Sequence, residues 1–326
     1  MAQRTEITCI IPNYNGADVI GECLASVFAQ SIPCALIVVD DGSTDESLSV
    51  IEELLREHPE ARLLRHTENK GFAAAVNTGI LAAKTPYVLL FNNDATAKKT
   101  LAERMLQAIT RREKCFSVSG LLLQAARPYL IDDCGDYFSA FGRAFSPGRD
   151  KPRAQFDKPA QIQSACAGCA LYDRKVLLSL GLFDEAFGSY LEDVDLGLRA
   201  LRAGYSNEYE PSAVAFHKAS HTSGGRYNAF KARQTTANTL LVIAKNVPLA
   251  AKICFAPLFL AGLFARAVFY ASKGLFSAYL NGLRDGICKI RAYDRAADPA
   301  STQCSFRRDL LLSFAFLGNC IRALRR

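Results

Sequence analysis

Short apolar runs alternate with longer segments of helical periodicity through the first 110 residues. The apolar, β-branched runs predict buried strands at 7–11, 35–39, 63–64 and 88–91. Apolar residues at helical spacing predict helices at 19–29, 48–55, 71–83 and from about residue 100 onward. Strands that alternate with helices of this length imply right-handed crossovers. The pattern therefore predicts an α/β fold with a mostly parallel, Rossmann-like sheet.

Polar residues follow three of these runs, at 12–15, at Asp40-Asp41 and at 92–94. Ligands of open α/β sheets bind beyond the carboxyl ends of the strands, so these clusters are expected to share one edge and to face a nucleotide. The alternative for Asp41-Gly42 is an ordinary turn.

Two helix starts carry the residue pairs of a capping box. Ser43 precedes Glu46, and Thr100 precedes Glu103. Both pairs predict reciprocal hydrogen bonds at the first turn of the following helix.

The second half of the chain has one sharp acidic motif. Residues 115–165 predict loops and short strands over the mouth of a site, followed by a strand at 170–172, a helix at 175–180 and a helix from Glu192 to Ala203. The acids of the last helix could simply stabilise its N-terminus. However, Glu192, Asp195 and Arg199 share a stripe, whereas Asp193 points elsewhere. If Asp195 pairs with Arg199, Asp193 is the candidate general base.

Histidines and cysteines supply weaker signals. His217 follows an apolar run at 214–216, where a structural role is the usual reading. Together with Asp94 it could instead complete a site for a divalent cation, with His221 as the weaker alternative.

Cys166 and Cys169 have the spacing of a metal or redox pair. They lack a second pair, so small residues lining a crevice are favoured.

The C-terminal part is basic and apolar. From residue 245 onward there are 13 Lys and Arg against 4 Asp and Glu, within a net charge of +7 for the whole chain. The apolar stretch 247–271 contains an uncharged run, 253–265, that is shorter than the roughly 20 residues needed to span a bilayer. An interfacial helix or shallow hairpin is favoured; a single span and a buried helix pair remain open. The interleaved apolar residues argue against binding of nucleic acid.

The absence of two nucleotide-binding motifs weakens several other classes of enzyme. Neither a Walker A loop nor G-x-G-x-x-G follows a predicted strand, which weakens kinase, ATPase and dehydrogenase readings. The 11 scattered cysteines, with no basic-then-apolar pattern at the N-terminus, are expected to be reduced cytosolic thiols.

Several motifs in order resemble family 2 glycosyltransferases, over roughly residues 5–248, and most closely their rhamnosyltransferase-like branch. They are Ile10-Ile11-Pro12-Asn13-Tyr14-Asn15, Val39-Asp40-Asp41-Gly42-Ser43-Thr44-Asp45, Asn69-Lys70-Gly71-Phe72 with Asn77, Phe91-Asn92-Asn93-Asp94 and Glu192-Asp193-Val194-Asp195-Leu196. The resemblance implies an inverting enzyme of the nucleotide-diphospho-sugar transferase (glycosyltransferase A) fold.

The resemblance also implies the roles of individual residues. Asp193 would be the catalytic base beside Glu192, and Asp94 with His217 would bind Mg²⁺ or Mn²⁺. The donor-binding set would be Pro12, Tyr14, Asp40, Asp41, Lys70, Asn92 and Asn93. Asn92 stands where the family's D-x-D motif begins with an acid, so metal affinity is expected to be lower. The N-N-D form favours a deoxysugar donor.

These inferences predict a catalytic domain at 1–245, with a nucleotide-sugar half at 1–112 and an acceptor and base half at 113–245. A membrane-associating region is predicted at 246–326. The expected activity is transfer from a nucleotide-diphosphate sugar to a saccharide or polyprenyl-linked acceptor at the cytoplasmic face of the membrane. Lys and Arg residues in 218–233 would help to offset charge on the leaving group. Rival readings are a non-catalytic, membrane-attached nucleotide-sugar-binding scaffold and a sugar nucleotidyltransferase.

Overall fold

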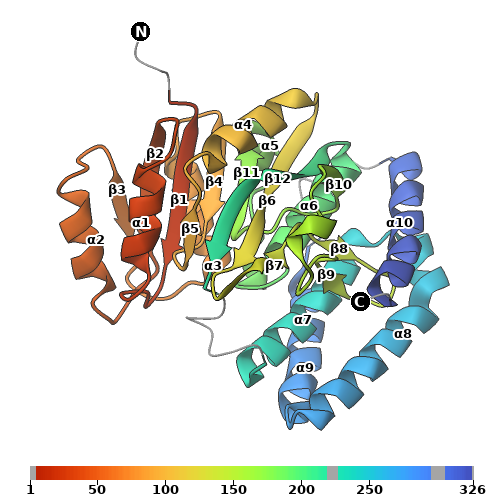
Figure 1. Cartoon of the computed structure of the whole chain (residues 1–326). Coiled ribbons are helices and arrows are strands. Elements are labelled where there is room, and N and C mark those ends of the chain that lie inside the picture. The colour runs from red at the N-terminus through yellow and green to blue at the C-terminus, as the bar shows by residue number, and fades with distance from the viewer. Residues whose placement is uncertain (1–4, 219–226, 295–304, 325–326) are drawn as a thin grey trace.

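The computed structural model describes residues 5–218, 227–294 and 305–324. Its first part alternates strands and helices, as the hydrophobic pattern predicts (Figure 1). The elements are β1 (Ile7–Asn13), α1 (Ile20–Phe28), β2 (Cys34–Asp40), α2 (Ser47–Leu55), β3 (Arg62–Arg65), α3 (Phe72–Ala82), β4 (Tyr87–Phe91), β5 (Ala95–Ala97) and α4 (Leu101–Arg111).

The second part adds the other side of the sheet and four C-terminal helices. Its strands are β6 (Cys115–Gln124), β7 (Arg127–Asp133), β8 (Tyr137–Phe138), β9 (Ala144–Phe145), β10 (Ala160–Ile162), β11 (Cys169–Asp173) and β12 (Ser206–His217). Its helices are the short η1 (Arg153–Gln155), α5 (Arg174–Ser179), the short η2 (Glu185–Phe187), α6 (Glu192–Ala203), α7 (Ala229–Asn246), α8 (Leu249–Ser272), α9 (Phe276–Ala292) and α10 (Phe306–Leu324).

Ten of these strands form one sheet. Its main path is β10-β12-β6-β11-β4-β1-β2-β3, with β5 pairing with β12 and β7 pairing with β6. The strands β3, β2, β1 and β4 are parallel, as are β6 and β12, whereas β11 runs antiparallel to both of its neighbours. The prediction of a mostly parallel α/β sheet is therefore confirmed.

Helices cover both faces of the sheet. Cys9 and Ile11 of β1 point to the layer made by α1, α2 and α4, and Ile10 points to the layer made by α3, α5 and α6. All three side chains are fully buried. Continuous apolar strands of this kind are expected where both faces of a parallel sheet are covered.

Both predicted capping boxes are wrong in their hydrogen bonds. The Ser43 hydroxyl donates to Asp40 Oδ1 (2.6 Å), and α2 begins later, with Asp45 accepting from the backbone N–H of Ser47 (3.0 Å). Thr100 does stand at the start of α4 but makes no capping bond with its side chain. The turn after β2 closes onto Asp40 because that buried carboxylate needs donors.

The expectation of loops and short strands through 115–165 is wrong for β6. This ten-residue strand lies inside the sheet, between β11 and β12. Its serines and glycine obscured the apolar pattern, yet each has a buried place. Ser117 donates to Asn207 Oδ1 (2.7 Å), and a Cβ on Gly120 would lie 2.8 Å from the Ala213 carbonyl oxygen.

The apolar stretch near residue 260 forms one helix, α8, with Pro257 inside it. A hairpin within this stretch is wrong because the helix is continuous. A buried helix pair is wrong because only 6% of the most apolar window of α8 is buried. By length and composition α8 could cross a membrane. Its only central charge, Arg266, instead donates hydrogen bonds to the Gly142 carbonyl oxygen and to Thr239 Oγ1. These bonds hold α8 along the rest of the protein.

A buried ionic network joins α6 to α7. Asp195 is fully buried and accepts from Arg199 Nε (2.8 Å), as the helical stripe predicts, and from Asn246 Nδ2 (2.7 Å). Lys245 Nζ lies 3.3 Å from Asp195 Oδ1 and also pairs with Asp184. Burial raises the pKa of Asp195, but the nearby charges of Arg199 and Lys245 outweigh it and hold the pKa below its usual value.

Asp195→Asn is expected to lower the free energy of unfolding by about 3 kcal/mol, because two buried cations lose their shared carboxylate. Since the folded-state pKa of Asp195 is lowered, its contribution is present above about pH 4 and is lost as the pH falls through the folded-state value. Chemical denaturation at pH 7 and pH 3 measures both effects. Asp157→Asn, at an exposed position, is the matched control. Equal stability of the two variants at pH 7 would contradict the network's role.

Candidate active site

The three polar clusters that follow the apolar strands meet at one edge of the sheet. Asn13, at the end of β1, donates to Asp40 Oδ1 at the end of β2 (3.0 Å). Asn93, just after β4, donates to Asn13 Oδ1 (2.8 Å). The predicted shared edge is therefore confirmed. β1 runs downward in Figure 1, so this edge lies toward α7 and α9.

Asp40 and Asp41 both turn inward and are nearly fully buried. Asp40 Oδ2 accepts from the Ser43 N–H (3.1 Å) in addition to the side-chain bonds already described. Asp41 accepts from His66 Nδ1 (2.6 Å) and from the backbone N–H groups of Lys70 (3.0 Å) and Gly71 (2.8 Å). In this structure the two carboxylates shape the turns at this edge of the sheet.

The other predicted donor-binding residues lie around these carboxylates. Pro12 and Tyr14 are half-buried, and Lys70 exposes its side chain. Asn93 is buried and engaged with Asn13. Contact of this set with a nucleotide stays a prediction.

Asp193 lies at the first turn of α6 and is half-buried. Its Oδ2 accepts from the backbone N–H of Ala167 (3.2 Å) and its Oδ1 from that of Val194 (2.8 Å). Arg199 bonds to Asp195 and not to Asp193, so the side chains of Asp193 and Asp195 point in different directions from α6, as the stripe predicts. The predicted separation of Asp193 from the Asp195–Arg199 pair is therefore confirmed, and its role as the base stays a prediction.

The pKa of Asp193 is raised above its ordinary value. Burial raises its pKa, partly offset by the N–H groups of Ala167 and Val194. Burial, together with the charge of Asp193, raises the pKa of Glu192 well above its usual value, and Glu192 Oε2 is buried without a hydrogen-bond partner. Glu192 therefore holds a proton more readily than its neighbour, which leaves the charge on Asp193.

One short loop connects Asp193 to the segment after β4. Ala167 donates to Asp193, and the next carbonyl oxygen, of Gly168, accepts from the Asn92 N–H (3.0 Å). A Cβ on Gly168 would lie only 3.0 Å from Asn92 Nδ2. Cys169 is buried in the core, and the interpretation of 166–169 as small residues that line a crevice stays a prediction. The ten cysteines of the described ranges are all free thiols.

His217, the last residue of β12, bridges two carboxylates. Its Nε2 lies 3.0 Å from Asp94 Oδ1 and its Nδ1 lies 2.7 Å from Asp132 Oδ2. Burial alone would lower the pKa of His217, but the hydrogen bonds and charges of Asp132 and Asp94 outweigh it and raise the pKa to about 10. Without a cation the imidazole carries a proton at neutral pH.

The same atoms fit a divalent cation. Neighbouring ligands of an octahedral ion with bonds of about 2.1 Å lie about 3.0 Å apart, which matches the separation of Asp94 Oδ1 and His217 Nε2. The Asn92 amide nitrogen is 3.4 Å from the same imidazole atom, and a flip of the amide would direct its oxygen there. Asp132 on Nδ1 is the outer carboxylate that commonly orients a ligating histidine.

Sequence reasoning missed Asp132, Arg149 and His66. Arg149 pairs with Asp132 (3.1 Å), and His66 bridges Asp41 and Thr78 Oγ1 (2.9 Å). The Asp132-Asp133 pair after Ile131 repeats the pattern of Asp40-Asp41 after Val39, which was the available signal. Asp133, whose pKa burial raises to about 6, lies with Asp136 and Cys166 in a group whose ligand-type atoms are within 4.8 Å of one another.

The structure describes only some of the Lys and Arg residues predicted at 218–233 to act on the leaving group. Lys218 pairs with Glu22 (2.9 Å) and Arg233 pairs with Asp285. Lys231 is close enough to Asp94 and Asp132 for their charges to act on it. His221 and Arg226 lie outside the described residues.

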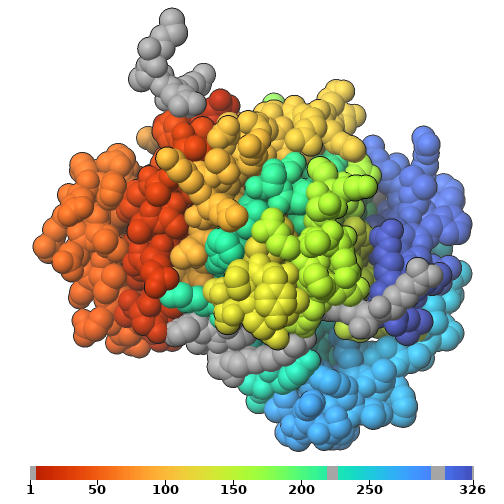
Figure 2. Space-filling model, in the orientation of Figure 1, coloured from red at the N-terminus to blue at the C-terminus, as the bar shows by residue number. Residues whose placement is uncertain are grey.

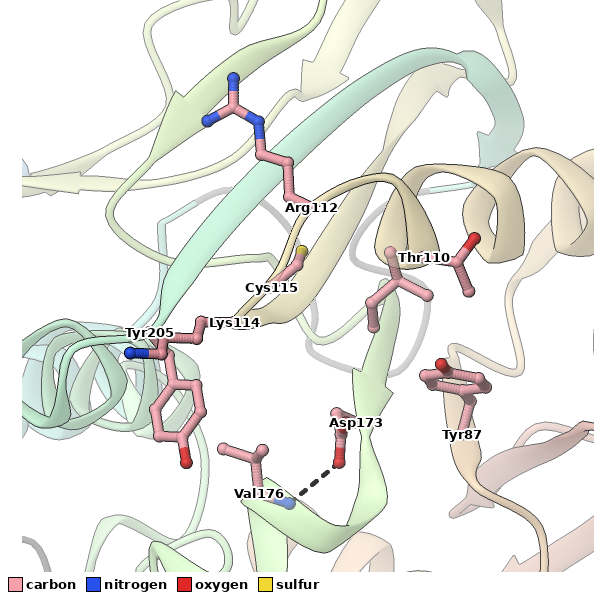
Figure 3. Close-up of a pocket in the computed structure, with 9 residues that line it drawn as sticks. Tyr87, Thr110, Arg112, Lys114, Cys115, Asp173, Val176 and Tyr205 are labelled. Atoms are coloured by element: carbon pink, nitrogen blue, oxygen red, sulfur yellow. Dashed lines mark hydrogen bonds between the residues drawn. The ribbon is translucent and has the colours of Figure 1, made fainter.

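A separate cavity of about 390 Å³ lies at the amino-terminal edge of the parallel strands, away from these residues (Figure 3). Tyr87 and Cys115, at the starts of β4 and β6, line it together with Asp173. Asp173 accepts from the Val176 N–H (3.0 Å) and so caps α5. The cavity therefore lies at the edge of the sheet opposite to the polar clusters.

Comparison with known proteins agrees with this geometry. The family model described as glycosyl transferase family 2 matches residues 8–181. Glycosyltransferase GlyG of Streptococcus pneumoniae is 33% identical over 109 residues, which are 33% of this chain and 36% of GlyG. An N-acetylglucosaminyl-diphospho-decaprenol L-rhamnosyltransferase of Mycobacterium tuberculosis is 28% identical over 226 residues, 62% of this chain and 72% of that enzyme.

A solved structure shows the same fold. The mannosyltransferase PcManGT of Pyrobaculum calidifontis, in complex with GDP-Man and Mn²⁺, superposes with a TM-score of 0.55 at 22% identity, covering 96% of this chain and 86% of that one. The predicted glycosyltransferase A fold is confirmed. Because the family model covers more than half of the residues, this chain belongs to glycosyl transferase family 2.

Proposed function

We propose that the protein is an inverting glycosyltransferase in which Asp193 is the general base. The observation that carries the proposal is the loop 166–168, which bonds both to the Asp193 carboxylate and to the segment Asn92–Asp94. A base and a diphosphate-binding segment that share one rigid loop are held in a constant relation, as direct displacement requires.

The reaction is a single displacement at the anomeric carbon. The acceptor hydroxyl oxygen forms a bond to that carbon, while the bond from the carbon to the diphosphate oxygen breaks. The hydroxyl proton passes to Asp193, and the nucleoside diphosphate leaves with the electron pair. The raised pKa of Asp193 makes it a stronger base than an exposed aspartate.

A divalent cation is proposed at Asp94, His217 and Asn92, where it would offset charge on the leaving diphosphate. The spacing of the ligand atoms supports this, as does Mn²⁺ in the complex of PcManGT. The cation must displace the proton of His217 in order to bind.

The donor is proposed to be a nucleotide-diphosphate deoxysugar such as L-rhamnose, and the acceptor a saccharide or polyprenyl-linked saccharide. The relative named as a rhamnosyltransferase acts on N-acetylglucosaminyl-diphospho-decaprenol, as its name states. The N-N-D form at 92–94 and the apolar C-terminal helices agree with such substrates.

The C-terminal helices are proposed to lie on the cytoplasmic face of the membrane as an interfacial anchor. The exposed side of α8 carries Leu249, Ile253, Leu260, Phe264 and Val268, and α10 exposes Phe306, Leu311, Phe314 and Ile321. These helices form the flank drawn in blue in Figure 2. Because Arg266 faces inward, the exposed side of α8 is free of charge through its second half, while the net charge of the region is basic.

Asp193→Asn is expected to lower kcat at least about 10³-fold, because the amide cannot accept the acceptor proton, while the Kd for the donor nucleotide stays within about twofold. Initial rates with a panel of dTDP-, UDP- and GDP-sugars, together with calorimetry, measure the two quantities. Asp157→Asn is the control. Retained turnover in Asp193→Asn would remove Asp193 from the role of base.

The affinity of the metal site for Mn²⁺ is expected to rise by up to about tenfold per pH unit below pH 10, because the ion competes with the proton on His217. Titration of bound Mn²⁺ by electron paramagnetic resonance between pH 6.5 and 8.5 measures this. His217→Gln should flatten the dependence and His58→Gln should not. A flat profile in the unaltered protein contradicts the site.

Replacing both Leu260 and Phe264 with Glu should lower partition onto vesicles containing anionic phospholipid by at least about tenfold, since two exposed apolar side chains no longer enter the interface. Co-flotation measures the bound fraction. Leu81→Glu, at an exposed position of α3, is the control. Unchanged flotation of the double variant would refute the anchor.

A further inference from the structure

The loop 187–191, directly before Glu192 and Asp193, has an unusual backbone. Gly188, Tyr190 and Leu191 have φ values of 67°, 72° and 68°. Tyr190 and Leu191 have side chains that disfavour this region, so the loop keeps its shape only where its surroundings hold it. The orientation of the start of α6 depends on those surroundings.

Asn238 of α7 is the centre of the contacts that hold this loop. Its side chain is fully buried, and the two N–H groups of Nδ2 are shared among three acceptors, the carbonyl oxygens of Phe187 (2.9 Å), Ser189 (2.9 Å) and Tyr190 (2.7 Å). Gln234, one turn earlier on α7, donates a further bond to the Phe187 carbonyl oxygen (2.8 Å).

Lys289 of α9 orients the Asn238 amide. Its Nζ donates to Asn238 Oδ1 (2.7 Å) and lies 3.5 Å from the Phe187 carbonyl oxygen. With Oδ1 engaged by a cation, Nδ2 is directed at the loop carbonyls. Since α9 packs beside α7, Lys289 brings a polar contact from the basic C-terminal region to the loop (Figure 1).

The loop also contacts the nucleotide half of the predicted site. The Gly188 carbonyl oxygen accepts from the Ala73 N–H (3.0 Å) at the start of α3. Two residues earlier, the Gly71 N–H donates to Asp41 Oδ2. A Cβ on Gly71 would lie 3.2 Å from the Gly188 carbonyl oxygen, so the two turns are in close contact. The loop thus lies between the Asp41 turn and the Asp193 helix.

We propose that Lys289 and Asn238 are positioning residues for the transfer reaction, which makes the C-terminal helices part of the catalytic unit as well as an anchor. They act through the loop 187–191 by fixing the direction in which Asp193 leaves α6. This inference rests on the proposed function of Asp193 as the base. It assigns α9 a role that is separate from lipid binding.

The test compares Lys289→Met with Arg284→Met in the full-length protein. Both remove one positive charge from α9, but Arg284 is exposed and lies one and a half turns away. Lys289→Met is expected to lower kcat about tenfold, with KM and Kd for the nucleotide sugar within about twofold. It should also speed hydrogen exchange of the peptide 187–194. Arg284→Met should change none of these, and both variants should bind anionic vesicles equally.

Unchanged kcat and exchange in Lys289→Met, or equal losses in Arg284→Met, would overturn the proposal. If Lys289→Met does not fold, Gln234→Leu removes a different bond to the same loop and must show the same fall in kcat with an unchanged KM. Failure of the proposed function is distinguishable, because Asp193→Asn would then retain turnover whatever the effect of Lys289→Met.

Discussion

The buried carboxylate of Asp195 is the constraint on which the arrangement of the site depends. It lies in the core with no access to water, so its charge must be matched by Arg199, Lys245 and the Asn246 amide. Matching fixes the rotation of α6 against α7. Once that rotation is set, Asp193, two residues earlier, has to leave the helix on another side, toward the loop 166–168. The placement of Asp193 is thus a consequence of how a neighbouring charge is neutralised.

At the polar edge of the sheet, side chains that look like ligand contacts also build the scaffold. Asp40 accepts hydrogen bonds from Asn13 and Ser43, and Asp41 accepts them from His66 and from two backbone N–H groups. These bonds fasten the loops after β1, β2 and β4 to one another. The turns at this edge are thus held in place by the protein's own side chains, so a ligand bound there would not have to order them.

The C-terminal helices combine two kinds of surface. Outward, α8 and α10 present apolar side chains such as Phe264 and Phe314. Inward, α7 and α9 present amide and ammonium donors to the carbonyl oxygens of the loop before α6. The apolar outer face has the character of an interaction surface, and the polar inner face provides hydrogen bonds to backbone carbonyl oxygens between η2 and α6.

The sequence by itself determined the alternation of strands and helices, the common edge of the polar clusters and the direction of Asp193. Each of these follows from the local pattern, since continuous apolar runs mark strands buried on both faces and a period of 3.6 decides which side of a helix faces the core. The pairing of Asp195 with Arg199 was also readable, because both lie on one helix. The resemblance to the family was also readable, because each of its motifs is a short continuous run of residues.

Only the tertiary structure decided the rest. β6 was missed because the buried partners of its serines and glycine come from distant segments. Two contacts join residues far apart in sequence, that of Asp132 with His217 and that of Lys289 with Asn238. The raised pKa of Asp193 depends on its burial in the folded protein. Burial and long-range pairing set these properties, and neither leaves a periodic signal along the chain.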